Sequence, residues 1–444
     1  MRELVVVALL AAAFTSRALA GAPAAPPAPG SSSDVTPMPP VVDAAATPTV
    51  GAANGPPAAG PTAGGAGSGL RDVQIHGFVS EGGFLSTSGD YIGASSSGSL
   101  ELFEAAVNVS TAVTDRLRAG AQLFARDFGT LEDPPRFDWA FLDYRWRSWL
   151  GLRAGIVKMP FGLYNEYADI DSARLPILMP QGVYSFRNRD VLLSQRGFAV
   201  YGDVALGGGN DLEYQVWLGT LSIPNNALNV GGATLDRINT KYVTGVQAFW
   251  HPRLEGLRLG GTVLRTSIDF NLTLSPANVA ALTMAGVVPP GYAGALVVSQ
   301  RPDTWMVASA EYAHDEWLFA AEYSRAFKRQ RSSLPIVLPT FHEDAEQFYG
   351  MVAYRGSDQL EVGGYYSVHN LDAGDRHGRS AKYAERFYAF QRDLTATLRF
   401  DANEHWLWKL EAHFMDGTAD LPASTNPTPQ RYWGLFLLRT TVSF

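Results

Sequence analysis

The chain has 444 residues, of which 18% are charged and 11% aromatic, and 43 acidic against 35 basic side chains give a formal net charge of -8. This charge balance argues against nucleic-acid binding, and the absence of cysteine excludes a disulfide scaffold. The charged fraction lies below the roughly 25% typical of soluble domains. No run approaches the roughly 18 apolar residues of a membrane helix. The apolar residues are instead spread over the chain.

The first segment in chain order has the layout of a cleavable secretory signal. Arg2 precedes an apolar run over residues 4–14, and Ala18-Leu19-Ala20 precedes Gly21. The run is shorter than the roughly 20 residues that a retained membrane helix needs. We therefore expect residues 1–20 to be removed on export.

Residues 21–70 consist mainly of Ala, Pro, Gly, Ser and Thr, with hardly a charge. This composition offers nothing to bury and predicts a disordered linker, which we expect in the periplasm. The linker is either a spacer toward the cell wall or an untethered tail. No second segment of this kind divides residues 71–444, so the rest of the chain is expected to be one domain.

Apolar and polar residues alternate through most of this domain, which is the period of a β-strand. Near its start, for example, Val73 and Ile75 alternate with Gln74 and His76. Sixteen strands are expected, beginning near Val73, Phe103 and Leu117 and continuing as Phe137–Arg147, Leu150–Pro160, Arg196–Leu206, Asp211–Leu221, Lys241–His251, Leu257–Asn271, Thr304–His314, Trp317–Lys328, Ala345–Arg355, Leu360–His369, Glu385–Phe400, Trp406–Asp416 and Arg431–Phe444.

The expected connections alternate between short turns and long loops. An even number of strands then places all short turns and both ends of the domain on one side, as in bacterial outer-membrane barrels. The short side would face the periplasm. Aromatic residues are expected near both membrane interfaces: Trp146, Trp250, Trp317, Trp406 and Phe444 on the periplasmic side, and Phe137, Trp139, Trp305, Phe327 and Trp433 on the outer side.

The predicted fold is all-β, a transmembrane antiparallel β-barrel of about sixteen strands over residues 71–444. Strands in lipid must close into a barrel, since an open edge would leave amides unpaired in hydrocarbon. A barrel of this size is too wide for side chains to fill and leaves an aqueous channel. The alternative is a soluble sandwich with the aromatic residues in its core, but so long a sandwich would have many unprotected strand edges.

One stretch, Phe161–Gln195, has neither strand nor helix periodicity but is rich in charged and aromatic residues. A loop this long is usually functional or disordered. Pro160 and Gly162 can end the preceding strand and allow a sharp bend, so we expect the stretch to fold into the barrel mouth. The alternative is a loop on the outer surface. A second long loop, Leu272–Asp303, is almost uncharged and could contact a neighbouring subunit or form a mobile cap.

Three features of the chain resemble Gram-negative outer-membrane porins of the sixteen-strand type. They are the strand RYWGLFLLRTTVSF ending at Phe444, the stretch GIVKMPFGLYNE over Gly155–Glu166, and a longest loop in third place among the outward loops. The spacing Lys158-x-Pro160-x-Gly162 resembles phosphate-selective porin O/P-like porins. The resemblance implies a third loop that folds into the lumen and narrows it, and a homotrimer.

Charged residues at inward-facing positions predict the charge selectivity of the pore. The inward-facing positions of the strands and the stretch Phe161–Gln195 together give the expected pore-lining or constriction residues, which are Arg118, Arg126, Arg145, Arg153, Lys158, Glu166, Asp169, Asp171, Arg174, Arg187 and Arg189. Loop carboxylates facing a wall of arginines would create a transverse field. Arginine suits anions, so selectivity would tilt toward anions. Alternatively, each arginine pairs with a neighbouring carboxylate and has no effect on selectivity.

Motifs of catalysis are missing from the sequence. His342-Glu343 lacks the second histidine of a zinc-protease helix, and neither a G-x-S-x-G elbow nor a G-x-G-x-x-G turn occurs. We expect no enzyme and no cofactor or metal. The sequence predicts a passive channel for small hydrophilic solutes or ions in outer-membrane lipid. The alternative is a plugged barrel that acts as a receptor or envelope anchor through its long loops.

Overall fold

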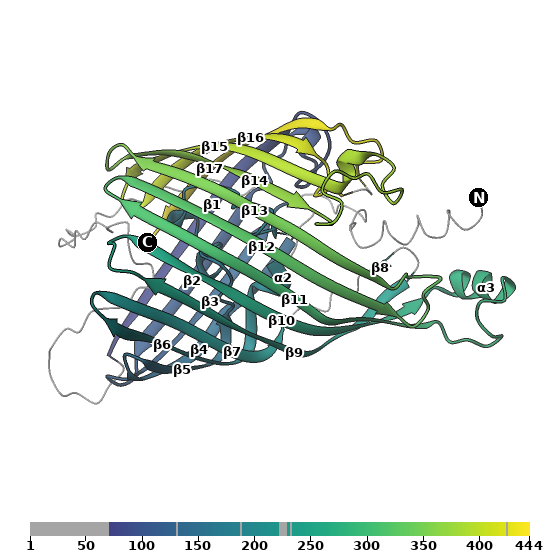
Figure 1. Cartoon of the computed structure of the whole chain (residues 1–444), viewed down its shortest axis with the longest axis horizontal. Coiled ribbons are helices and arrows are strands. Elements are labelled where there is room, and N and C mark those ends of the chain that lie inside the picture. The colour runs from purple at the N-terminus through teal and green to yellow at the C-terminus, as the bar shows by residue number, and fades with distance from the viewer. Residues whose placement is uncertain (1–70, 130–131, 187–188, 222–228, 231–232, 423–424) are drawn as a thin grey trace, which may run out of the picture.

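The computed structural model describes residues 71–129, 132–186, 189–221, 229–230, 233–422 and 425–444. The expected signal segment 1–20 and linker 21–70 lie outside these ranges. Within them, sixteen strands form one closed wall (Figure 1). They are β1 (Arg71–Ser86), β2 (Phe103–Ala112), β3 (Leu117–Asp127), β4 (Glu132–Arg147), β5 (Leu150–Lys158), β6 (Ser194–Gly207), β7 (Asn210–Leu221), β9 (Ala233–His251), β10 (Leu257–Leu274), β11 (Ala295–His314), β12 (Trp317–Ser332), β13 (Phe341–Arg355), β14 (Leu360–Asn370), β15 (Phe390–Asn403), β16 (Trp406–Gly417) and β17 (Tyr432–Ser443).

Each strand pairs antiparallel with the next, and β1 closes the ring on β17 from Phe78 opposite Ser443 to Ser86 opposite Leu435. The two-residue β8 (Asn229–Val230) pairs only with β9 and stands outside the wall. Closure leaves every wall strand with a partner on both sides, which satisfies the backbone groups that lipid cannot. The predicted closed barrel of sixteen antiparallel strands is therefore confirmed.

Period-two alternation separates an inner from an outer face along each strand. On β17, Leu437, Arg439 and Thr441 are buried, whereas Leu438 and Val442 are about half exposed. This arrangement, with apolar side chains on the outer face and polar ones on the inner face, is the reverse of that in a soluble domain. It suits a barrel wall that has lipid outside and water inside.

The connections lie in two groups at opposite ends of the barrel (Figure 1). The short ones span 113–116, 148–149, 208–209, 252–256, 315–316, 356–359 and 404–405. Those at the other end are longer, with one exception at 128–131, and the longest is 159–193. The predicted alternation of turns and loops is confirmed. Some predicted strand starts are wrong. Residues Arg386–Ala389 form a 3-10 turn, so β15 begins only at Phe390, and four strands begin four to nine residues earlier than predicted, at Glu132, Ala233, Ala295 and Phe341.

Three of the residues expected at the outer aromatic interface face the other way. Trp139, Trp305 and Trp433 are buried on the inner side, whereas Phe137 is exposed. The reason at Trp139 is a β-bulge, because Gln122 pairs with Trp139 and Leu123 with Phe137, which leaves Asp138 as an extra residue. Because of the bulge, Phe137 and Trp139 point to opposite faces, although regular alternation along a strand places residues two positions apart on the same face.

The strands β9 to β11 extend beyond the neighbouring wall and carry a helix, α3 (Pro276–Met284), at their tip (Figure 1). Ser275 caps α3 by accepting a hydrogen bond from the backbone N–H of Asn278 at 3.3 Å. None of the residues of α3 is buried. Of the loop expected over Leu272–Asp303, both ends are strand, at 272–274 and 295–303, and residues 275–294 connect the two strands. No helix in the described ranges is long and apolar enough to cross a membrane.

Candidate functional site

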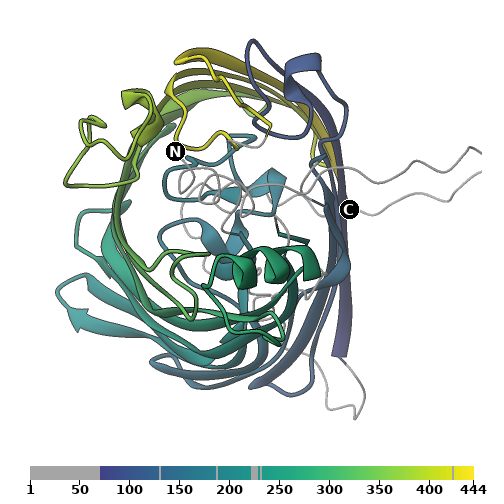
Figure 2. The same ribbon diagram turned by 90° about the vertical axis from the view of Figure 1, so that its right-hand side faces the viewer.

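Residues 159–193, which we call the inner segment, join β5 to β6, and the described part of them, 159–186 and 189–193, lies inside the ring (Figure 2). They contain two 3-10 turns, Asn165–Tyr167 and Asp171–Ala173, and the short helix α2 (Arg189–Leu192). Apolar residues of the segment pack against inward-facing side chains, for example Phe161 edge-on against Trp305 with ring centroids 6.3 Å apart. Two of the four buried apolar clusters in the described residues therefore lie between this segment and the wall.

The first turn of the inner segment is bound to strands across the ring from β5. The Gly162 N–H donates to Thr262 Oγ1 on β10 at 3.2 Å, and the Leu163 N–H donates to Glu322 Oε1 on β12 at 2.9 Å. Gly162 has a φ of +62°, and a Cβ there would lie 2.6 Å from Glu322 Oε1. Glycine is thus required where the segment turns in and approaches the far wall.

Glu322 on β12 is a buried acceptor for the inner segment. Besides the Leu163 N–H, its carboxylate accepts hydrogen bonds from the hydroxyls of Tyr184, Tyr349 and Ser309, the last at 2.5 Å. Tyr184 belongs to the segment, and the other two belong to the wall. Four donors on one carboxylate satisfy its buried charge without a cation. The alternation of β12 places Glu322 inside, but its role could not be found from the sequence.

The middle of the inner segment is bound on a third side of the ring. The N–H groups of Ile177 and Leu178 donate to the carboxylate of Glu411 on β16, at 2.7 and 2.8 Å. Lys409, also on β16, donates from Nζ to the carbonyl oxygens of Asp171 and Arg174, at 2.6 and 2.7 Å. The segment therefore spans the lumen from β5 to β16 and divides it.

Asp171 is the charged centre of that attachment. Its carboxylate is fully buried and lies 3.0 Å from Lys409 Nζ, 3.8 Å from Arg439 Nη1 and 3.6 Å from Arg174 Nη2, and it accepts a hydrogen bond from Thr441 Oγ1 at 2.7 Å. Burial alone would raise its pKa, but Lys409, Arg439 and Arg174 outweigh burial and lower the pKa well below 3.8. Asp171 is therefore an anion at every physiological pH.

A second buried group of charges holds Asp169 and Arg189 of the inner segment against β4 and β5. Lys158 Nζ lies 2.7 Å from Asp138 and 2.5 Å from Asp169, while Arg189 lies 2.8 Å from Asp169 and 3.4 Å from Asp138. The two positive charges and the two negative charges of this group cancel. Burial opposes the ionised form of Asp169, yet Arg189 and Lys158 lower its pKa. Asp138 was not among the site residues predicted from the sequence. Its place between two aromatic residues, Phe137 and Trp139, was a possible signal of a β-bulge that turns it inward.

The four arginines expected to form one wall are distributed differently. Arg145 on β4 pairs with Asp203 on β6, two strands away, at 2.6 Å, and Arg153 on β5 pairs with Asp143 on the adjacent β4 at 3.1 Å. Both arginines therefore bind nearby carboxylates, the alternative noted from the sequence. Arg118 shares a cavity with them, whereas Arg126 lies in another, together with Asp169, Arg174 and Arg189. Asp169 and Asp171 face Lys158, Arg189, Lys409 and Arg439 instead. Arg187 lies outside the described residues.

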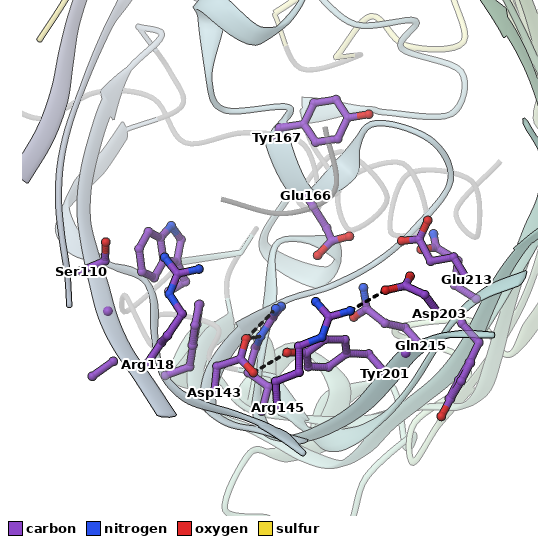
Figure 3. Close-up of a pocket in the computed structure, with 18 of the residues that line it drawn as sticks. Ser110, Arg118, Asp143, Arg145, Glu166, Tyr167, Tyr201, Asp203, Glu213 and Gln215 are labelled. Atoms are coloured by element: carbon purple, nitrogen blue, oxygen red, sulfur yellow. Dashed lines mark hydrogen bonds and ion pairs between the residues drawn. The ribbon is translucent and has the colours of Figure 1, made fainter. Parts of the chain in front are cut away.

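The larger cavity, of about 320 Å³, lies on the short-turn side of the inner segment, and we call it the vestibule (Figure 3). Its lining includes Arg118, Arg145, Arg153, Glu166, Tyr201 and Glu213. Glu166 reaches down into it from the segment. Burial raises the pKa of Glu166, and this effect exceeds the opposite effect of nearby Arg153. In the described part of the chain no group of three or more His, Asp and Glu side chains is placed to hold a metal ion.

Comparison with known proteins relates the chain to others through its fold alone. No family model and no curated protein matches the sequence. A structure of OmpF of Salmonella typhi in complex with daunomycin has a TM-score of 0.52 and 11% identity, covering 84% of this chain and 97% of that one. The outer membrane channel DcaP of Acinetobacter baumannii has a TM-score of 0.50 and 14% identity, with coverage of 84% and 97%. The chain therefore shares the closed-barrel fold of these outer-membrane proteins.

Proposed function

We propose that the protein is a passive diffusion channel for small hydrophilic solutes in a bacterial outer membrane. The observation that carries this proposal is a closed wall with an apolar exterior around a lumen that the inner segment narrows and that still contains the vestibule. Outward side chains such as Phe198, Leu218 and Phe414 are more than half exposed. A face of this kind is stable in lipid and would aggregate in water.

The test is conductance of the purified full chain in planar lipid bilayers. We expect stable ohmic steps, because the vestibule is polar and the segment is held in one position by buried contacts on β10, β12 and β16. A protein that inserts but gives no steps would contradict the channel and favour a plugged barrel. The reversal potential in a salt gradient then measures selectivity. A weak preference for anions is proposed, with Arg118 as the main contributor because Arg145 and Arg153 are paired.

The remaining parts of the proposal concern assembly and export. We propose a homotrimer, which the resemblance to porins supports and chemical cross-linking in detergent tests. Residues 1–20 are proposed to be a cleaved signal and residues 21–70 a periplasmic linker. Sequencing the N-terminus of the mature protein from outer-membrane fractions tests the cleavage, and protease added to the periplasmic side tests the linker.

A further inference from the structure

The vestibule contains a group of oxygen acceptors on one side without a matching donor. Glu166 comes from the inner segment, and Glu213 and Gln215 come from β7. Gln215 Oε1 is buried without a hydrogen-bond partner, and Oε2 of Glu213 also accepts no hydrogen bond, although His251 Nε2 lies 3.4 Å from it. Gln215 favours the ionised form of Glu166 and so acts to lower its pKa. Gln215 is only 9% exposed. Buried acceptors are nearly always satisfied in proteins, so an unpartnered one that lines a cavity points to a missing donor.

Neither acid has a strong cation of its own among the described residues. Glu166 has no ion pair within 4.0 Å, and the ion pair of Glu213 is with His251 at 3.4 Å, which is charged only when protonated. Arg153, the cation that most lowers the pKa of Glu166, is held by Asp143 and lies over the Phe141 ring at 4.7 Å. This side of the vestibule is therefore an acidic pole.

Arg118 on β3 lies on the other side of the vestibule (Figure 3). It forms no ion pair within 4.0 Å in the part of the chain that the structure describes. Its register partner on β4 is Asp143, but one oxygen of that carboxylate accepts from Arg153 and the other from the Tyr201 hydroxyl at 2.5 Å. Arg118 thus keeps its donors free and forms a cationic pole opposite the acids.

Charges between the two poles cancel locally. Arg145 binds Asp203 and Arg153 binds Asp143, and both guanidiniums lie near the Tyr201 ring, 5.8 and 5.0 Å from its centre. Of the other charged residues in the lining, Arg258 is paired with Glu311 at 2.9 Å, and Asp115 and Arg116 add one charge of each sign. The field across the vestibule therefore arises mainly from Arg118 on one side and Glu166 with Glu213 on the other. Ions of one sign are attracted by one pole and repelled by the other, whereas a molecule with both charges is favoured at both ends.

We infer that the vestibule is a transient binding site for small zwitterions, with the carboxylate of the solute at Arg118 and its ammonium at Glu166, Glu213 and Gln215. This inference rests on the proposed channel and names the class of solute for which it has a site. A volume of about 320 Å³ holds one small molecule at a time. The planar donors of arginine match a carboxylate, and the three acceptors match the three donors of an ammonium.

The test is osmotic swelling of liposomes that contain the full chain, with 4-aminobutanoate as the zwitterion and erythritol as the uncharged four-carbon control. The wild type should admit the zwitterion faster than erythritol at low concentration. Arg118→Gln, Glu213→Gln and Glu166→Gln should each lower the ratio of the two rates about two- to fivefold, the effect of one partly exposed ion pair. The erythritol rate should not change. Matched controls are Arg329→Gln and Glu255→Gln, exposed residues outside the vestibule, which should leave the ratio as in the wild type.

Two failures can be told apart. If the wild type admits neither solute and conducts no ions, the proposed channel itself is refuted. If it admits both but the ratio is the same in the wild type and in all three vestibule variants, the channel stands and the zwitterion site is refuted. A shift of reversal potential toward cations in Arg118→Gln and toward anions in Glu213→Gln, without a change in the ratio, would show that the poles act on separate ions and would also overturn the inference.

Discussion

Replacing Asp171 by Asn removes the charge that holds the inner segment to β16 and β17 while keeping the shape of the side chain. In the wild type this one carboxylate lies within 4.0 Å of Lys409, Arg439 and Arg174. The other carboxylate that binds this group of cations is Glu104, which pairs with Arg439. The substitution therefore leaves fully buried positive charge without its counterion.

The size of the effect follows from burial. Lys409, Arg439 and Asp171 are all fully buried, and removing one partner of a buried pair costs about 3–5 kcal/mol. At about 1.4 kcal/mol per factor of ten, the detached form of the segment should become at least a hundredfold more populated. The ladder hydrogen bonds of the wall do not depend on Asp171, so the barrel itself should remain closed.

Trypsin cleavage after Arg174 measures this detachment, because Arg174 lies in the segment and is 8% exposed in the attached form. Faster cleavage and larger, noisier conductance steps are expected in Asp171→Asn. The control is Arg145→Gln, which breaks a pair whose two side chains are each 49% exposed and which should cost only about 0.2–1 kcal/mol. Equal cleavage rates in the two variants would refute the attachment by Asp171. Since the pKa of Asp171 is lowered, its contribution is complete above pH 3.8 and is lost only in stronger acid.

Three further predictions concern other parts of the lumen and wall. Because the pKa of Glu166 is raised, it loses its charge at a higher pH than an ordinary glutamate, so the reversal potential should move toward anions as the pH falls from neutral toward about 4.3; Glu166→Gln should remove most of this dependence. Glu322→Gln places an amide donor against four donors and should destabilise the turn of the segment by about 1–3 kcal/mol, seen as added current noise. Gly155→Ala places a Cβ 2.3 Å from the Ala140 carbonyl oxygen at a φ of +132° and should lower the temperature at which the barrel unfolds in gel-mobility assays, whereas Gly350→Ala, where a Cβ meets nothing within 4 Å, should not.

The wall of the barrel could be predicted because its signal is local. Alternation along a strand, turn residues between strands and an even strand count need only neighbouring residues. For the same reason prediction failed where the local period is interrupted, as at the bulge of Asp138, which reverses Trp139, and at the 3-10 turn over Arg386–Ala389. A single extra residue changes the face of those that follow.

The composition of the inner segment predicted that it has a functional role, and the sequence showed which of its side chains are charged. The sequence did not predict which residues these side chains contact, since Asp171 accepts a hydrogen bond from Thr441, 270 positions away. Arg153 likewise pairs with a carboxylate on the adjacent strand and Arg145 with one two strands away, and both pairings depend on strand register.

The sequence by itself determined a closed wall with an apolar exterior and a polar lumen, because closure in lipid is required by backbone hydrogen bonding and follows from periodicity. Only the tertiary structure decided which charges in the lumen are cancelled and which stay free. Contacts across a lumen depend on the stagger of sixteen strands and on the path of one segment between them, and neither is encoded within a few residues of the groups that meet.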